Sequence, residues 1–244
     1  MRSLLIATLL PLAACGMASI GSADDGLPGI PAQGAGKTRT FAVADFTAVE
    51  LRGSDDVDVR VGPGFSVRAD GEAELLDHLK ITRDGATLRV SRIAQNGWTW
   101  RGKGARIAVT LPRLASASVA GSGDMTIDRV AGKDFSGAGA GSGSMTIDAL
   151  QVDKADISLA GSGDIKIAGT ARELTVSLAG SGDVEAGDLK AARASVSVAG
   201  SGSVRAGVDG PASVSVMGTG DVDLGDGAKC QTTKMGTGSV RCGS

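Results

Sequence analysis

The stretch Leu178–Val184 reads LAGSGDV, and its central Gly-Ser-Gly phrase returns throughout the second half of the chain, with threonine replacing serine in the last two copies. The first glycine of the phrase is found at Gly121, Gly141, Gly161, Gly180, Gly200, Gly218 and Gly236. Successive copies are therefore 18 to 20 residues apart. Seven copies at nearly constant spacing indicate a repeat architecture, in which each copy belongs to one structural unit.

Residues on both sides of the phrase alternate between apolar and polar. This period of two is typical of strands with one buried face. Two positions stay apolar from copy to copy: Val119, Leu159, Leu178, Val198 and Val216 before the glycine, and Met125, Met145, Ile165, Val184, Val204, Val222 and Val240 after it. We expect stacked copies to align these residues as aliphatic ladders. The outer face would carry a polar ladder of Ser118, Ser158, Ser177, Ser197, Ser215 and Thr233.

Either a meander of hairpins or a β-helix would produce this pattern. A meander shows similar turn signals at both ends of its strands, about every 8 to 12 residues. Here one end of each repeat is nearly invariant, whereas the other varies, as AGTAREL and AGDLKAAR show. The asymmetry favours an all-β, parallel β-helix-like solenoid of 18–20-residue coils with the GSG phrase at one tight corner.

The chain ahead of the repeats follows a less regular version of the same plan. FTAVELRGSDDVDVRVG (Phe46–Gly62) is interpreted as a divergent first coil with its corner at Gly53. Asp84-Gly85 lies between two apolar runs and predicts a hairpin, and EAELLDHLK is the one helix candidate. We expect a single domain over residues 41–244, with its repeats over 117–244.

These segments resemble the bacterial GIN domain, a family labelled as an auto-transporter adhesin head. The resemblance covers about residues 41–242 and is carried by the F..VEL.GSDDVDVRVG opening, the LKITRDGATLRVSR hairpin, the VTLPRLASASVAGSGD junction and the serial GSGDV units. It implies a right-handed, parallel β-helix-like fold in an exported protein. It brings no established reaction and no catalytic residues.

The first 15 residues are typical of an export signal. An apolar run follows Arg2, and Leu12-Ala13-Ala14-Cys15 is similar to a bacterial lipobox, which predicts lipid attachment at Cys15. Cleavage after Gly21-Ser22-Ala23 is the alternative and would leave a soluble periplasmic protein. Residues 16–40 are rich in Gly, Ala, Ser and Pro and are interpreted as a flexible tether. We expect an exported protein anchored in the cell envelope, with the outer membrane favoured because Gly16 is not the aspartate of inner-membrane retention.

Composition excludes several function classes. Basic and acidic residues are mixed along the chain and the formal net charge is only −2, so nucleic-acid binding is not expected. Aromatic residues make up 2% of the chain, whereas enzymes that act on polysaccharides gather acids, a base or metal, and aromatic platforms. The single histidine, His78, is interpreted as a surface or partly packed residue and not as a catalytic base. We predict no catalytic residues and no cofactor.

The aspartates that follow the glycines are the weak candidates for calcium, namely Asp124, Asp164, Asp183 and Asp221. Ca²⁺ takes six to eight oxygen ligands, whereas each coil offers one carboxylate and three of the seven carry serine instead. The favoured interpretation is therefore that Asp or Ser accepts backbone hydrogen bonds within its own turn. Only Asp164 and Asp183 are expected to be neighbours, and no metal site is predicted.

QNGWTWRGKGAR is the one anomalous stretch, because it holds both tryptophans. Trp98 and Trp100 would share a face, beside Arg101, Lys103 and Arg106, and would suit an anionic glycan or a partner protein. The alternative is that the rings cover an open end or edge of the rod. These five residues are the candidate ligand contacts.

Two cysteines flank the last corner, six residues before and six after Gly236. Cys230 and Cys242 have the parity of inward-facing residues, and an exported protein meets an oxidising compartment. We predict a disulfide that fastens the final coil, with free thiols or a metal site as alternatives.

Together these features predict a non-enzymatic adhesin or binding head of the cell envelope, built on the solenoid. It would be attached to the membrane by its lipid and directed at an envelope or surface protein or glycan. The alternative is a periplasmic carbohydrate-binding or calcium-responsive module, and a degenerate polysaccharide-active enzyme is a third.

Overall fold

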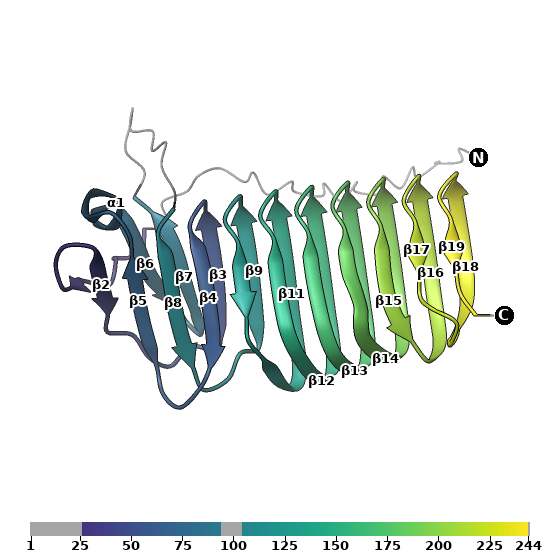
Figure 1. The fold of residues 1–244 in the computed structure, drawn as a ribbon, viewed down its shortest axis with the longest axis horizontal. Coiled ribbons are helices and arrows are strands. Elements are labelled where there is room, and N and C mark those ends of the chain that lie inside the picture. Colours follow the sequence, from purple (N-terminus) through teal and green to yellow (C-terminus); the bar gives the residue numbers. More distant parts are fainter. Residues whose placement is uncertain (1–25, 94–103, 244) are drawn as a thin grey trace, which may run out of the picture.

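The computed structural model describes residues 26–93 and 104–243. They form a β-solenoid of about six turns, with coils of about 20 residues, and a curled mixed sheet at the N-terminal end. Figure 1 shows the coils side by side along the long axis, from β9 to β18. The predicted all-β solenoid is therefore confirmed.

The solenoid strands follow the repeat closely. They are β9 (Ser116–Gly121), β10 (Met125–Ile127), β11 (Val130–Gly141), β12 (Met145–Gly161), β13 (Ile165–Gly180), β14 (Val184–Gly200), β15 (Val204–Val208), β16 (Gly210–Gly218), β17 (Val222–Asp223), β18 (Ala228–Gly236) and β19 (Val240–Arg241). Each of β12, β13 and β14 runs from one GSG corner to the next, so one bent strand makes a whole coil.

Parallel pairing keeps equivalent residues of successive coils in line. Leu159 pairs with Leu178 and Leu178 with Val198, all at most 2% exposed. Met145 and Ile165 are paired in the same way on the arm after the corner. The predicted aliphatic ladders are confirmed, and they form one continuous core with the buried residues of the N-terminal strands. Val240 is only half-buried because it belongs to the last coil.

The corners explain why the phrase needs both of its glycines. Gly180 has a φ of 136°, a region that favours glycine, and a Cβ there would overlap the carbonyl oxygen of Gly161. A Cβ on Gly182 would meet Gly163 of the previous coil in the same way. That carbonyl of Gly161 accepts the amides of Ser181 at 2.9 Å and Gly182 at 3.1 Å. Backbone therefore stacks directly on backbone at every corner.

The N-terminal strands include a first coil that is far from the others in sequence. They are β1 (Ala32–Gln33), β2 (Thr38–Phe41), β3 (Ala48–Gly53), β4 (Asp56–Val61), β5 (Ser66–Asp70), β6 (Leu79–Asp84), β7 (Thr87–Arg92) and β8 (Arg106–Leu111), with the short helix α1 (Ala73–Asp77) between β5 and β6. β3 pairs in parallel with β9, so that Gly53 lies against Gly121. The divergent first coil, the helix and the Asp84-Gly85 hairpin are all confirmed.

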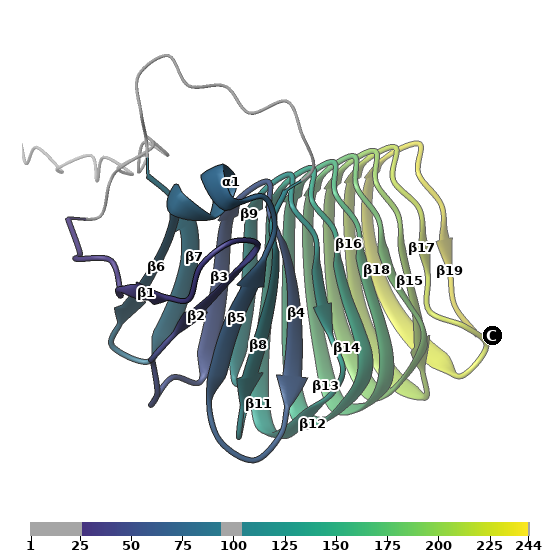
Figure 2. The same ribbon diagram turned by 60° about the vertical axis from the view of Figure 1, so that its left-hand side comes forward.

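Beyond the first coil, the sheet curls to cover the end of the core (Figure 2). β7 and β8 pair in parallel with β3 and β4 and make one further coil. β6 is antiparallel to β7, and β5, β2 and β1 continue the other face in antiparallel order. The folded part therefore begins before residue 41: β1 and most of β2 lie within residues 16–40, which were expected to be a tether, because their backbone completes this sheet.

No helix in residues 26–93 and 104–243 is long and apolar enough to cross a membrane.

Candidate functional site

The aspartates of the corners bind the next coil, not their own turn. Asp124 Oδ1 accepts the amide of Ser144 at 2.8 Å, and Asp183 Oδ1 accepts that of Ser203 at 2.7 Å. Equivalent bonds join Asp164 to Asp183 and Asp221 to Ser239. The expected bond within the turn is therefore wrong, because parallel stacking points this amide along the solenoid axis toward the neighbouring coil.

A second aspartate pair lies beside the expected one. Because β4 pairs with β10, Asp56 is next to Asp124, whose amide it accepts at 3.3 Å. Asp164 and Asp183 are thus not the only two aspartates that lie side by side in the row of corner aspartates along the solenoid. Within the described parts of the chain, no three His, Cys, Asp or Glu residues gather as a metal-binding group. The row suits hydrogen bonding between coils better than the six to eight oxygens of a calcium site.

Asp221 has the strongest of these contacts. Its Oδ1 accepts both the hydroxyl of Ser239 at 2.6 Å and its amide at 2.8 Å, and these bonds hold the pKa of the carboxyl below its ordinary value. Ser239→Ala removes the hydroxyl, so we expect the pKa of the Asp221 carboxyl to rise toward its ordinary value. An NMR titration of the carboxyl carbon measures this change.

The lowered pKa of Asp221 also determines how the bond affects stability at different pH values. A carboxyl with a lowered folded-state pKa favours folding above its unfolded pKa, and the contribution is lost as pH falls through the folded value. The wild-type protein should therefore have a higher free energy of unfolding than Ser239→Ala near neutral pH, and this difference should disappear at low pH. An identical titration in both proteins would contradict the hydrogen bond.

Asp55 is the one buried acidic side chain among the described residues, and its exposed fraction is 0%. Its two oxygens accept from the Arg92 guanidinium at 2.6 and 2.9 Å, and Oδ1 also accepts the backbone amide of Ala105 at 2.8 Å. Arg92 ends β7, and Ala105 immediately precedes β8. Asp55 therefore holds together the two ends of residues 93–105.

This clamp occupies a solenoid corner of unusual length. In the next coil β3 and β4 are joined by residues 54–55, whereas residues 93–105 join β7 and β8 at the equivalent place. Asp55 itself stands where the repeats carry the second glycine of the phrase. A side chain fits there because it faces Gly104, at which an added Cβ would overlap the Ser54 carbonyl oxygen. Sequence reasoning missed Asp55, although the departure of GSDD from GSGD was a visible signal.

Four of the five predicted ligand contacts, Trp98, Trp100, Arg101 and Lys103, lie outside the described residues. Arg106 is described: it begins β8, is exposed, and its Nε lies 3.5 Å from Asp58 Oδ2. Cys15, the predicted lipid attachment site, also lies outside the described residues.

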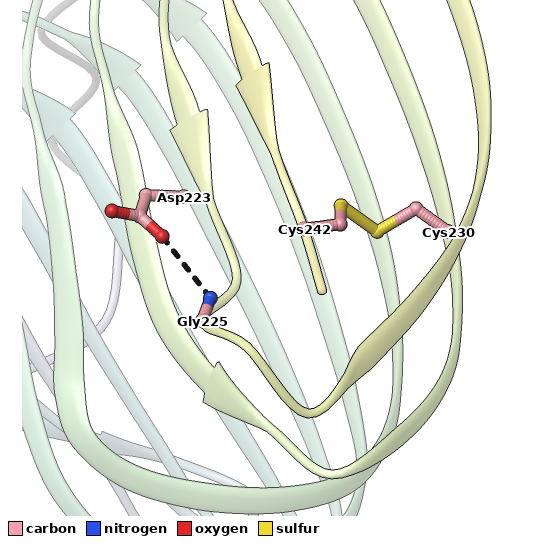
Figure 3. Close-up of a disulfide and its surroundings, with 4 residues drawn as sticks. All are labelled: Asp223, Gly225, Cys230 and Cys242. Carbon is pink, nitrogen blue, oxygen red and sulfur yellow. Dashed lines mark hydrogen bonds between the residues drawn. A yellow bond between two sulfur atoms is a disulfide. The ribbon is translucent and has the colours of Figure 1, made fainter. Parts of the chain in front are cut away.

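Cys230 and Cys242 form a disulfide across the last coil, with their Cα atoms 6.2 Å apart (Figure 3). Both are half-buried and pack against the end of the core. Asp223 accepts the amide of Gly225 at 3.1 Å in the turn that leads into this coil. Thr232, which shares the parity of Cys230, is exposed because no described strand covers it.

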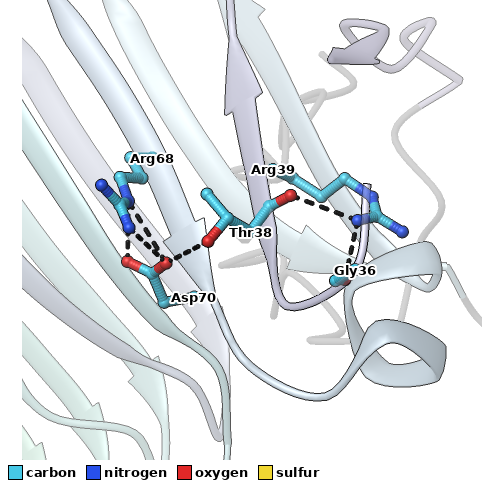
Figure 4. Close-up of polar contacts among 5 residues, drawn as sticks. All are labelled: Gly36, Thr38, Arg39, Arg68 and Asp70. Carbon is cyan, nitrogen blue, oxygen red and sulfur yellow. Dashed lines mark hydrogen bonds and ion pairs between the residues drawn. The ribbon is translucent and has the colours of Figure 1, made fainter. Parts of the chain in front are cut away.

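A polar network attaches β2 to the N-terminal sheet (Figure 4). Asp70 accepts the Thr38 hydroxyl at 2.7 Å and a two-nitrogen contact from Arg68. These bonds lower the pKa of Asp70, chiefly through Arg68. Arg39 donates to the Gly36 and Thr38 carbonyls. His78 is the C-cap residue of α1, and its Nδ1 lies 2.8 Å from the Glu74 carbonyl oxygen. These contacts hold β2 and α1 against the N-terminal sheet.

Comparisons with known proteins found one family and several solved structures of similar fold. Residues 45–227 match the family described as "Putative auto-transporter adhesin, head GIN domain". A "putative adhesin" from Bacteroides fragilis is 22% identical, with a TM-score of 0.77 over 84% of this chain and 95% of its own. Two Parabacteroides distasonis structures are similar as well. One is a "putative adhesin", 19% identical, with a TM-score of 0.66 over 85% of this chain and 97% of its own.

The other is a "putative lipid binding protein", 22% identical, with a TM-score of 0.65 over 87% of this chain and 98% of its own. No curated protein matches the chain. At these identities the solved structures establish the fold alone, whereas the family match covers most of the chain. The solenoid with its GSG corners belongs to the GIN-domain family of auto-transporter adhesin heads.

Proposed function

We propose that the chain is a non-enzymatic binding head anchored in the cell envelope, and that residues 94–106, at the unusual corner, are its ligand contact. In this proposal the solenoid is a support, and Trp98 and Trp100 stack on sugar rings while Arg101, Lys103 and Arg106 meet anionic groups. Cys15 carries the lipid that retains the protein at the membrane, with the outer membrane as its location.

The observation that carries the proposal is the clamp of Asp55 on Arg92 and Ala105. Insertions at one corner of a repeat protein commonly form its binding face. Here the inserted residues hold both tryptophans of the chain, and their two ends are fixed by a buried ion pair. The two-residue corner between β3 and β4 shows that a short connection is enough to join the two arms of a coil. The extra residues between β7 and β8 are therefore not required to cover the core.

Repeat chemistry supports placing the ligand here and not along the coils. The corner aspartates are engaged with backbone amides, and in β12, β13 and β14 the arm before the corner presents small outward side chains such as serine and alanine. Interface anchors are typically Trp, Tyr and Arg. Of these, the two tryptophans occur only at the long corner.

The test uses bacteria that express the full chain as wild type, as Trp98→Ala with Trp100→Ala, or as Cys15→Ser. We expect the double alanine variant to stay in the membrane fraction but to lose affinity for immobilised anionic glycans by about tenfold or more. Cys15→Ser should leave the membrane fraction, and its purified form should keep the glycan affinity.

The matched control is Met217→Ala with Met235→Ala, which removes two exposed apolar side chains from the far end of the rod. Glycan binding that survives in the tryptophan variant, or that falls equally in the methionine control, would contradict the proposed contact. A Cys15→Ser protein that remains membrane-bound would contradict the anchor.

A further inference from the structure

The two ends of the solenoid differ in what lies beyond the last parallel coil. At the N-terminal end, antiparallel strands β5 and β6 continue the sheet. At the C-terminal end, β18 pairs with β16 and β19 pairs with β17, and no described strand lies on their other side (Figure 1). An open strand edge is a template for pairing with another chain. The C-terminal edge is therefore a place where a strand of another chain could add in parallel.

The final coil, formed by β18 and β19, carries a charge at one inward position where the other coils carry an aliphatic side chain. Leu178, Val198 and Val216 stand in one ladder, each two residues before the first glycine of its corner. Lys234 is in register with Val216 and takes the next place in this ladder. A strand stacked on β18 would have to bury the Lys234 ammonium in line with the aliphatic core, which is costly unless the charge is paired.

The glycines of the corners show where a further coil would lie. At each corner the carbonyl oxygen of the second glycine faces the second glycine of the next coil. A Cβ added to Gly220 would overlap the Gly202 oxygen, and a Cβ added to Gly238 would overlap the Gly220 oxygen. The last corner keeps this shape, because φ of its first glycine is 132° at Gly236 and 126° at Gly218. The Gly238 carbonyl therefore points out of the C-terminal end of the solenoid.

Lys234 binds this outward carbonyl. Its Nζ donates to the Gly238 carbonyl oxygen at 2.9 Å. The ammonium thus lies against the oxygen that a further coil would have to cover. Lysines on edge strands and inward-facing charges are two of the means by which β-proteins protect their strand edges from pairing.

We propose that Lys234 is a stop residue, which closes the C-terminal end of the solenoid to strands of other chains. A further strand could stack only if the ammonium left the Gly238 oxygen and were buried next to Val216 without a partner. The partner that Lys234 excludes is a parallel, valine-rich strand with a glycine corner, because this pattern stacks in every other coil. The inference depends neither on the ligand contact nor on the lipid anchor of the proposed function.

The probe is a fluorescent synthetic peptide with the sequence of residues 210–224, which contains one glycine corner and the valines on both sides of it. Its binding is measured by fluorescence anisotropy to the full chain carrying Cys15→Ser, so that no lipid is attached. We expect Lys234→Val, made in this chain, to bind the peptide at least about tenfold more tightly than the chain that keeps Lys234, because no charge has to be buried.

Three further variants identify the cause of any gain in affinity. Lys234→Met removes the charge but keeps a long side chain, and it should bind the peptide as Lys234→Val does. Lys234→Arg keeps an inward cation and should exclude the peptide. Lys229→Val is the matched control, because it removes an outward-facing cation from the same strand, and it should leave binding unchanged. Circular dichroism checks that each variant is folded.

Self-association of Lys234→Val in sedimentation velocity, absent from Lys229→Val, would support the proposal further. The proposal would be overturned if neither uncharged variant gained affinity for the peptide. It would also be overturned if Lys229→Val or Lys234→Arg gained as much affinity as Lys234→Val.

Discussion

Gly180→Ala is expected to lower the free energy of unfolding by about 4 kcal/mol, as the sum of backbone strain and overpacking. Gly180 has a φ of 136° and its added Cβ would overlap the Gly161 carbonyl oxygen. The atoms that this Cβ would meet are backbone atoms of Gly161, and not a flexible side chain that could move aside. The melting temperature should fall by roughly 10 °C, measured by circular dichroism.

Gly187→Ala is the matched control because it makes the same change in the following coil. An added Cβ at Gly187 would lie 3.5 Å from the Arg205 side chain, an ordinary contact with a flexible group. We expect its melting temperature to stay within a few degrees of wild type. Equal melting of the two variants would show that corner stacking does not require glycine.

Asp55→Asn is expected to cost about 3 kcal/mol, because it leaves a largely buried guanidinium without its carboxylate. Asp55 is fully buried, and the Arg92 side chain is 17% exposed. The amide of Ala105 also loses a charged acceptor at 2.8 Å. Urea unfolding measures the loss, and hydrogen exchange at Ala105 should become faster.

Asp58→Asn is the control for this second change. Asp58 also faces an arginine, Arg106 at 3.5 Å, but both side chains are well exposed. Exposed ion pairs contribute about 0.5 kcal/mol or less, so the variant should unfold almost as wild type. If Asp55→Asn were equally harmless, the buried clamp would not be what holds Arg92 and Ala105 together.

Regular repeats made the core and the corner predictable from the sequence. Leu178 and Val184 had to face inward because alternation and the 18–20-residue spacing repeat the same local choice in every coil. Residues such as Asp55 do not repeat. Its partner Arg92 is 37 residues away, and nothing in the local pattern indicates that the two meet.

The sequence also did not show that the corner aspartates accept hydrogen bonds from the neighbouring coil. A short polar side chain after two glycines suits a bond within its own turn, and that interpretation of Asp183 is locally reasonable. The acceptor role is decided by the amide of Ser203 in the neighbouring coil, whose position depends on the stacking register. Likewise Asp56 joins the row beside Asp124 only because β3 and β4 stack beneath β9 and β10.

The sequence by itself determined the repeat, the solenoid, the inward ladders and the need for glycine at each corner, because these follow from short-range alternation and from one spacing used many times. Tertiary structure decided the order of coils at the N-terminal end, the burial of Asp55 with Arg92, and the bonding of each corner aspartate to the next coil. These features depend on pairing between unlike segments far apart in the chain, where no periodic signal exists.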